Sequence, residues 1–306
     1  MTRPLILVHP PLPAFEAQLA TDYAVRHVAD MGADAADISA AIVIGSVGLP
    51  QEALAQLPAL KLIHCLGAGY DGVDVPAART RGIAVTNCPA VNAEDVADAA
   101  LGLMLSVLRN IAAGDRLVRA GGWVPPLAFP PVRRVKGQKL GIVGYGAIGR
   151  AIAQRAAGFG LDIRWTGPRP KADAAHPYEP DLAALATWAD ILCVAVKADA
   201  STDKLVNADI LAALGAEGVL INISRGSVID EDALIAALKA GKLRGAGLDV
   251  FIEEPTPPQR WADVPNVTLT PHLGGGVREA LVEFNRITME NVRRHFANEP
   301  LLTPVT

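Results

Sequence analysis

The sequence predicts an α/β protein with two doubly wound parallel sheets, and three observations lead to this fold class. The chain has 306 residues, which at roughly 100–200 residues per domain suggests two domains. Hydrophobic residues make up 51% of it and charged residues 20%, so a large core can be buried. Short runs rich in Val, Ile and Leu alternate with helical patterns, as in strands that crossover helices cover on both faces.

The first third of the chain predicts the smaller sheet, with five strands at 4–9, 24–29, 40–45, 60–65 and 82–87. A helical pattern follows, with Glu94 and Asp95 in an acidic first turn and apolar residues at helical spacing up to Leu108. This helix is expected to link the domains. A second helical pattern at 277–296 is expected to return the chain to the first domain.

The middle of the chain predicts six further strands, at 139–144, 162–166, 190–196, 218–223, 243–249 and 266–270. Six strands with crossovers are typical of a Rossmann dinucleotide-binding domain, which we assign to residues 99–278. Residues 1–98 and 279–306 then form a smaller, flavodoxin-like substrate domain. Between the two series, Trp123, Phe129 and four prolines within 121–131 predict a surface loop or an arm that reaches a partner subunit.

Charge and cysteine content exclude several classes of protein. The 28 Lys and Arg against 32 Asp and Glu give a net charge of −4, without the basic excess that nucleic-acid binding needs. Cys65, Cys88 and Cys193 lie far apart in apolar runs, which favours reduced core thiols and a cytoplasmic location. No signal peptide or membrane-spanning run is evident. The histidines show no metal-ligand spacing, so no metal is expected.

A glycine-rich turn follows the strand predicted at 139–144. Its glycines, Gly144, Gly146 and Gly149, have the G-x-G-x-x-G spacing, and a helical pattern comes next. In that setting the first glycine permits a tight turn, the second lets a pyrophosphate approach and the third lets helix and strand pack closely. The helix start, with Ala147 and Ile148, turns its amides toward the anion. The sequence therefore predicts a bound dinucleotide.

The end of the next strand indicates which dinucleotide. NAD-binding domains usually place a carboxylate there for the ribose 2′-hydroxyl, but this chain has Thr166, Gly167 and Arg169 instead. A carboxylate would repel a 2′-phosphate, whereas a hydroxyl and a guanidinium can bind it. We therefore expect NADP(H) to be preferred, with NAD(H) possible and a solvent-facing arginine as the alternative explanation.

Four segments resemble the D-isomer-specific 2-hydroxyacid dehydrogenase family over nearly the whole chain. They are 66–74, the glycine turn 144–149, 221–226, and 247–255 followed by 271–274. Two features make the chain most similar to the glyoxylate/hydroxypyruvate and hydroxyphenylpyruvate reductase branch. They are the missing carboxylate at the end of the strand 162–166 and the ending Pro300–Val305. The resemblance implies NADPH-dependent reduction of a 2-oxo acid to a D-2-hydroxy acid by a homodimer.

Three residues are candidates for the reaction. Arg225 follows a strand at its carboxyl end, and its planar fork can bind the substrate's carboxylate and carbonyl oxygens. His272 also follows a strand, and an imidazole can give up a proton near neutral pH. The resemblance implies that Glu254 orients His272 and favours its protonated form, with the adjacent Glu253 as the competing choice.

Further residues complete the predicted site. The flexible turn after the strand at 60–65 can present successive amides to the substrate carboxylate, and the resemblance implies that Ala68 and Gly69 supply them. Ser46 is expected beside Leu49 at the same pocket. The resemblance implies cofactor contacts from the segments that hold Val196, Ile223, Asp249, His272 and Gly274. The chain departs from the family pattern at two places near the expected cofactor site. Val196-Lys197-Ala198-Asp199 stands where the family has an apolar-Pro-Leu-Thr stretch. The three glycines 274–276 after His272 predict a floppier turn.

Two other functions compete with this prediction. The first is an NAD-dependent D-2-hydroxyacid dehydrogenase acting on phosphoglycerate or lactate, or a formate dehydrogenase. The second is a dinucleotide-sensing binding protein without catalysis, because a fold does not determine a function. The presence of Arg225, Glu254 and His272 together favours an enzyme.

Overall fold

The computed structural model describes residues 3–123 and 132–305. The chain divides into two compact units, residues 1–92 with 278–306, and residues 93–277. We expected the boundary between residues 98 and 99. Residues 93–98 instead form the first turns of a helix, α4 (Ala93–Leu108), whose buried side chains belong to the core of the second unit.

The first unit is built on a five-stranded parallel sheet in the order β2-β1-β3-β4-β5. This is the flavodoxin-like order 2-1-3-4-5, so the predicted class of this sheet is confirmed. The second strand is shorter than predicted, because Val28–Asp30 forms a 3₁₀ turn, η1. The strands are β1 Leu5–His9, β2 Ala24–Arg26, β3 Ala40–Val43, β4 Leu62–Cys65 and β5 Ala84–Thr86.

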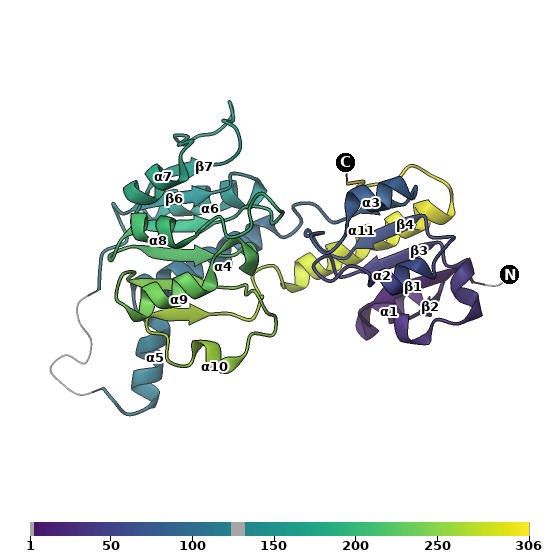
Figure 1. Cartoon of the computed structure of the whole chain (residues 1–306), viewed down its shortest axis with the longest axis horizontal. Helices are drawn as coiled ribbons and strands as arrows, with labels where there is room; N and C mark the ends of the chain where they lie inside the picture. The colour runs from purple at the N-terminus through teal and green to yellow at the C-terminus, as the bar shows by residue number, and fades with distance from the viewer. Residues whose placement is uncertain (1–2, 124–131, 306) are drawn as a thin grey trace. The chain divides into compact units, whose positions relative to one another are not determined.

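Helices cover both faces of this sheet, which explains why its strands are apolar without alternation. Ile6 and Val8 of β1 pack on one side in the core that includes the side chains of α1 and α11, while Leu7 packs on the other, with α3. The long α11 is the last helix of the chain, and it belongs to this unit (Figure 1). The helical segments are α1 Pro13–Leu19, η2 Ala33–Asp37, α2 Gln51–Ala55, α3 Val75–Thr80 and α11 Arg278–Phe296.

The second unit holds a six-stranded parallel sheet in the order β11-β10-β9-β8-β6-β7. A Rossmann sheet has a further strand outside β7. Here Tyr178 makes an isolated parallel bridge to Trp165 of β7, at the place of that strand. The order in which strands are added reverses at β6: β7 lies on one side of it, and β8 to β11 follow in turn on the other side. The strands are β6 Lys139–Val143, β7 Asp162–Thr166, β8 Ile191–Val194, β9 Val219–Asn222, β10 Gly245–Leu248 and β11 Val267–Leu269.

Two helical layers enclose this sheet. One core joins the strands to α4 and α6, and the other joins them to α7, α8 and α9 (Figure 1). The remaining helical segments are α5 Ile111–Arg119, α6 Ala147–Gly158, α7 Leu182–Trp188, α8 Ala208–Leu214, η3 Gly226–Val228, α9 Glu231–Lys239 and α10 Pro258–Trp261.

The helix predicted after residue 92 does not continue straight. It breaks at Asn110, whose φ of +53° lies in the left-handed region, and α5 follows. In the described part of the chain no single helix is long and apolar enough to cross a membrane; α4 and α5 meet that test only as a pair, with a bend of 61° between them. Of the predicted arm at 121–131, Trp123 is 71% exposed, and residues 124–131 lie outside the described residues.

Candidate active site

The glycine turn after β6 has the shape that a pyrophosphate requires. Gly144 has a φ of +97°, and a Cβ there would lie 2.7 Å from the Ala195 carbonyl oxygen. A Cβ on Gly149 would lie 2.1 Å from the carbonyl oxygen of Gly144, so both positions require glycine. By contrast, a Cβ on Gly146 would meet nothing within 4 Å. The space that a side chain would fill therefore lies open at the start of α6, and a dinucleotide phosphate fits there.

Residues around this turn differ in how well they could contact a cofactor. Val196 lies beside the turn, because a Cβ on Gly144 would be 2.8 Å from its Cγ1 atom. Ala147 and Ile148 form the first turn of α6. Ile223 is only 6% exposed and packs into the core under α4 and α6, which leaves little of its side chain for a ligand.

The loop after β7 offers two exposed cations, Arg169 and Lys171, and the end of the strand itself carries no carboxylate. Thr166 is 6% exposed, and Arg169 is exposed. The Tyr178 hydroxyl donates a 2.8 Å hydrogen bond to the Gly167 carbonyl and so fixes the turn between them. A carboxylate does follow in the loop, but Asp173 pairs with Arg150 at 2.8 Å, and this guanidinium lowers the pKa of Asp173.

A buried asparagine shapes the turn that carries Arg225. Asn222 accepts hydrogen bonds at Oδ1 from the Ser224 amide and hydroxyl, and its Nδ2 donates to the Arg225 carbonyl at 2.9 Å. The Arg225 guanidinium donates to the Ser224 carbonyl at 2.7 Å. Asn222 had no assigned role in the sequence analysis; its place at the last position of a strand before a polar turn was the available signal.

Gly226 brings the Arg225 turn against the loop after β10. A Cβ on Gly226 would lie 1.9 Å from the Phe251 carbonyl carbon and 2.2 Å from the Ile252 nitrogen. The two backbones therefore touch, which only glycine allows. In the same loop the Phe251 amide donates to Glu254 Oε1 at 3.0 Å, so the carboxylate is oriented by the backbone that packs on Gly226.

Glu254 pairs with His272, as predicted, and Glu253 does not take its place. The Nδ1 atom of His272 lies 2.7 Å from Glu254 Oε2, and the two side chains are 38% and 35% exposed. Because the carboxylate engages Nδ1, Nε2 is the ring nitrogen that can meet a substrate. His272 has a φ of +52°, and its amide donates to the Asp249 carbonyl at 2.8 Å.

Asp249 is hydrogen-bonded to the turn that carries His272. We expected this residue to contact the cofactor, but it is 3% exposed and its carboxylate accepts from Thr270 Oγ1 at 2.6 Å, the Leu273 amide at 2.9 Å and the Gly274 amide at 2.8 Å. A Cβ on Gly274 would lie 2.8 Å from Asp249 Oδ2. These bonds restrain the start of the turn in which the sequence predicted a floppier chain.

A second buried carboxylate, also missed from the sequence, supports the Glu254 loop. Glu231 is 3% exposed; its Oε1 accepts from the Ile252 amide at 2.7 Å and its Oε2 pairs with Arg260 at 2.7 Å. The pairing raises the pKa of Arg260. Glu231 begins α9, and a carboxylate in a first helical turn is so common that its sequence gives no sign of this second contact.

In the first unit, the loops after β3 and β4 pack backbone to backbone. A Cβ on Gly45 would lie 1.8 Å from the Gly69 carbonyl oxygen, so exposed Ser46 stands next to the predicted amide turn. Gly67 has a φ of +130°, which turns the following peptides. Within the residues described, the amides of Ala68 and Gly69 donate no hydrogen bond to other protein groups. Two such donors, side by side, suit a carboxylate.

Other features of the chain bear on cofactors and thiols. In residues 3–123 and 132–305, no group of three His, Cys, Asp or Glu side chains could hold a metal ion. Cys65, Cys88 and Cys193 are free and buried, and burial raises the pKa of Cys65 and of Cys193 to about 12.

A hollow of about 310 Å³ in the second unit is lined by Ala99, Gly102, Leu103, Ser106, Asp249, Thr268, Thr270, Leu273 and Gly274.

Comparison with known proteins shows what this chain is similar to. Residues 101–274 match the family model for D-isomer specific 2-hydroxyacid dehydrogenase, NAD binding domain. The chain is 40% identical over 268 residues to glyoxylate/hydroxypyruvate reductase A HPR2 of Arabidopsis thaliana, covering 88% of this chain and 85% of that one. It is 39% identical over 271 residues to hydroxyphenylpyruvate reductase of Plectranthus scutellarioides, covering 89% and 86%.

A solved structure agrees over the whole length. The NADPH-dependent glyoxylate/hydroxypyruvate reductase of Sinorhizobium meliloti, in complex with NADP and malonate, superposes with a TM-score of 0.92 at 39% identity. The match covers 100% of this chain and 97% of that one.

Proposed function

This chain belongs to the D-isomer specific 2-hydroxyacid dehydrogenase family, and on that premise we propose that it reduces small 2-oxo acids to D-2-hydroxy acids with NADPH. The substrate class is glyoxylate, hydroxypyruvate or an arylpyruvate, in keeping with the names of the relatives. The observation that carries the proposal is the 2.7 Å pair between His272 and Glu254. The loop that holds Glu254 packs against the Arg225 turn at Gly226.

Arg225 and the first unit's amides bind the substrate. The planar guanidinium of Arg225 accommodates a carboxylate oxygen and the ketone oxygen together, which orients and polarises the carbonyl. In the first unit, the amides of Ala68 and Gly69 hold the carboxylate, and Ser46 stands beside them. Because Arg225 acts on the ground state and on the developing alkoxide, its loss affects both KM and kcat, whereas loss of an amide contact to the carboxylate mainly raises KM.

His272 supplies the proton. As negative charge develops on the ketone oxygen, Nε2 of the protonated ring donates to it and the imidazole becomes neutral. Glu254 fixes the orientation of the ring through Nδ1, which leaves Nε2 for the substrate. NADPH, when bound, supplies the hydride. The products are the D-2-hydroxy acid and oxidised cofactor, so one proton and one hydride account for the reduction.

The cofactor occupies the glycine turn. Gly144, Gly146 and Gly149 with Ala147 and Ile148 cradle the pyrophosphate, and Val196 lies beside it. Arg169, with Gly167 and Thr166, receives the 2′-phosphate, since Asp173 is already neutralised by Arg150. A relative that is named as NADPH-dependent supports this choice.

The test is a panel of initial rates with glyoxylate, hydroxypyruvate and phenylpyruvate, each with NADPH and NADH. We expect turnover of at least one acid and a higher kcat/KM with NADPH. A preference for NADH would favour an NAD-dependent dehydrogenase. Binding of NADPH without turnover of any acid would favour the dinucleotide-sensing protein and overturn the proposal.

A homodimer in the cytoplasm is the proposed setting. Helix α5 has no buried residue, and Ile111 and Val118 are each 57% exposed, so this apolar surface suits a second copy of the chain. Three buried free thiols suit a reducing compartment. Light scattering tests the dimer: replacing both residues with Glu should give monomers, and an unchanged mass would contradict this interface.

A further inference from the structure

The two amides proposed for the substrate carboxylate belong to peptide units that are held from behind. The Gly67 carbonyl accepts from the Cys88 amide at 2.8 Å, and the Ala68 carbonyl accepts from Asn87 Nδ2 at 2.7 Å. In a trans peptide the C=O and N–H bonds point in opposite directions. Fixing these two carbonyls toward the end of β5 therefore fixes the N–H groups of Ala68 and Gly69 away from it, on the same side.

The two holds differ in kind. The Cys88 bond is made by the main chain and survives any side-chain substitution, whereas the Asn87 bond depends on one amide group. Asn87 is 7% exposed, so its side chain cannot exchange this carbonyl freely for water. The peptide that it fixes ends in Gly69, the residue type with the greatest backbone freedom.

Asn87 is itself positioned by the C-terminal segment. The Thr303 hydroxyl donates to the Asn87 carbonyl at 2.6 Å, and the Asn87 amide donates to the Thr303 carbonyl at 3.4 Å. Next to them, Pro304 makes an antiparallel bridge with Thr86, and the Val305 amide donates to the Val85 carbonyl. The last described residues thus run along the edge of β5.

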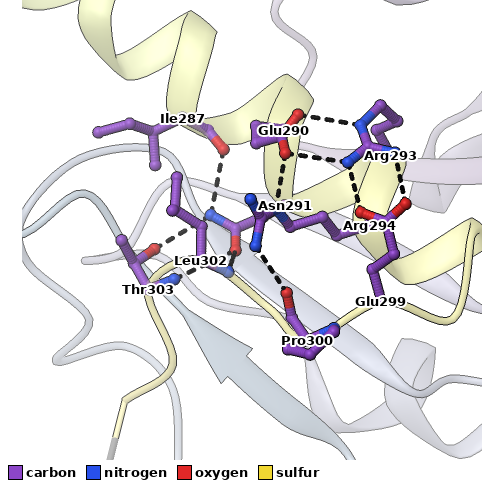
Figure 2. Close-up of polar contacts among 9 residues, drawn as sticks. All are labelled: Ile287, Glu290, Asn291, Arg293, Arg294, Glu299, Pro300, Leu302 and Thr303. Atoms are coloured by element: carbon purple, nitrogen blue, oxygen red, sulfur yellow. Dashed lines mark hydrogen bonds and ion pairs between the residues drawn. The ribbon is translucent and has the colours of Figure 1, made fainter.

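A fully buried asparagine on α11 fixes this segment (Figure 2). Asn291 Nδ2 donates to Thr303 Oγ1 at 3.0 Å and to the Ile287 carbonyl at 3.1 Å, and Oδ1 accepts from the Leu302 amide at 2.9 Å. Arg293 of α11 also pairs with Glu299 in the turn before this segment. These two side chains are about half exposed, and exposed ion pairs contribute little to stability. The buried amide of Asn291, rather than the surface ion pairs, determines where Thr303 lies.

We propose that Asn87 is a positioning residue that aims the Gly69 amide at the substrate carboxylate, and that Asn291 and Thr303 keep it in place. Asn87 touches no reacting atom; it acts through the Ala68–Gly69 peptide. The inference deepens the proposed function and depends on its assignment of the carboxylate to this turn. Loss of the Asn87 amide frees that peptide to rotate, which weakens carboxylate binding without altering the proton donor.

Two variants and a matched control test this role. Asn87→Ala should raise KM for glyoxylate and Kd for malonate about tenfold, the order of one hydrogen bond, with little change in kcat and none in the Kd of NADPH. Thr303→Val should act in the same direction and more weakly. The control is Ser39→Ala, which removes a 3.0 Å bond between Ser39, directly before the central strand β3, and His295 of α11 in the same unit. It should lower the unfolding temperature but leave KM unchanged.

The outcomes separate this inference from the proposed function. If the wild type reduces glyoxylate and Asn87→Ala has the KM of Ser39→Ala, the positioning role is overturned while the function stands. If the wild type reduces no 2-oxo acid, the proposed function fails, and malonate binding decides the inference. A Kd that Asn87→Ala weakens supports it; an unchanged Kd, or no malonate binding to the wild type, overturns it. Should Asn87→Ala not fold, an unchanged KM in Thr303→Val overturns it.

Discussion

The turn at Gly67–Gly69 and the loops with Arg225, Glu254 and His272 all follow parallel strands, but they offer opposite kinds of chemistry. The turn in the first unit presents backbone amides, which carry no net charge and have a fixed pKa far from neutrality. The loops in the second unit present charged side chains, each of which is held by its neighbours, at 2.7 Å in the case of His272 and Glu254. One region thus depends on direction and the other on charge.

This difference sets what mutation can do in each region. A charged side chain can be removed outright, and the partner charge that it leaves behind is then unpaired. A backbone amide cannot be removed by substitution; it can only be misdirected, through Asn87 or the residues behind it. Large effects are therefore expected in the second unit and graded effects in the first.

The largest loss of activity is expected at His272. His272→Asn removes the proton donor but keeps a polar side chain, and kcat should fall about 10²–10⁴-fold because general acid catalysis has that magnitude. Glu254→Gln should lose less, since the ring remains but is no longer paired with a charge. NADPH binding, followed by fluorescence, should be unchanged in both. Retention of kcat within tenfold in His272→Asn would mean that another group donates the proton.

Arg225 comes next. Arg225→Ala should lower kcat/KM by on the order of 2–5 kcal/mol of transition-state stabilisation, because an oxyanion loses its charged partner. Arg225→Lys keeps the charge but loses the planar fork, and should fall between the wild type and the alanine variant. Steady-state kinetics with a 2-oxo acid measure this series. Equal kinetics for all three proteins would exclude Arg225 from substrate binding.

Gly167 offers a test of cofactor choice within the second unit. A Cβ there would lie 3.5 Å from the nearest atom of Trp165, an ordinary contact, so a side chain fits. Gly167→Asp should shift the ratio of kcat/KM for NADPH over NADH roughly tenfold or more toward NADH, because its charge repels a 2′-phosphate. Gly167→Ala is the matched control and should leave the ratio nearly unchanged. The same ratio in both variants would place the 2′-phosphate elsewhere.

The smallest effect on activity, and a clear one on stability, is expected behind the first unit's turn. Buried His64 bonds Thr86 at 2.7 Å and Thr288 at 2.9 Å, and burial lowers its pKa from 6.5 to about 3. Below pH 6.5 the unfolded chain binds a proton that the folded protein does not. The free energy of unfolding should therefore fall as the pH falls from 6.5 toward 3, by up to about 1.4 kcal/mol per pH unit.

His64→Gln isolates this contribution, since glutamine does not titrate. Urea unfolding of both proteins at pH 7 and pH 5 should show a steeper loss in the wild type. Equal losses would mean that His64 takes up its proton in the folded state as easily as in the unfolded one.

The sequence predicted the side chains that carry chemistry better than it predicted what holds them. Arg225 and His272 follow predicted strands, and a parallel sheet gathers such positions at one edge, so their neighbourhood could be foreseen. Asn222, Glu231 and Gly226 were missed because their contacts form between loops that strand periodicity does not align. Asp249 was assigned to the cofactor by resemblance, and its three hydrogen bonds to the histidine turn could not be predicted because a carboxylate at a strand end looks the same whether it faces a ligand or a turn.

The first unit was harder for a related reason. Gly67 and Gly69 mark a turn in the sequence, but the groups that orient their peptides lie on β5's end, on α11 and near the C-terminus. Nothing in local composition distinguishes Asn87, Asn291 or Thr303 from ordinary polar residues. Their alignment depends on the antiparallel return of residues 303–305 along β5, which no pattern of apolar residues encodes.

The most direct test of the account is the wild-type kcat/KM for glyoxylate compared with that for glyoxal, under the same NADPH concentration. The two compounds share an aldehyde, but only glyoxylate carries the carboxylate that Arg225 and the first unit's amides are proposed to bind. We predict that the acid is preferred by a factor of roughly 10² or more, the order of two charge-assisted contacts. Comparable values for the two compounds would contradict the account, because no group of the enzyme would then be recognising a 2-oxo acid.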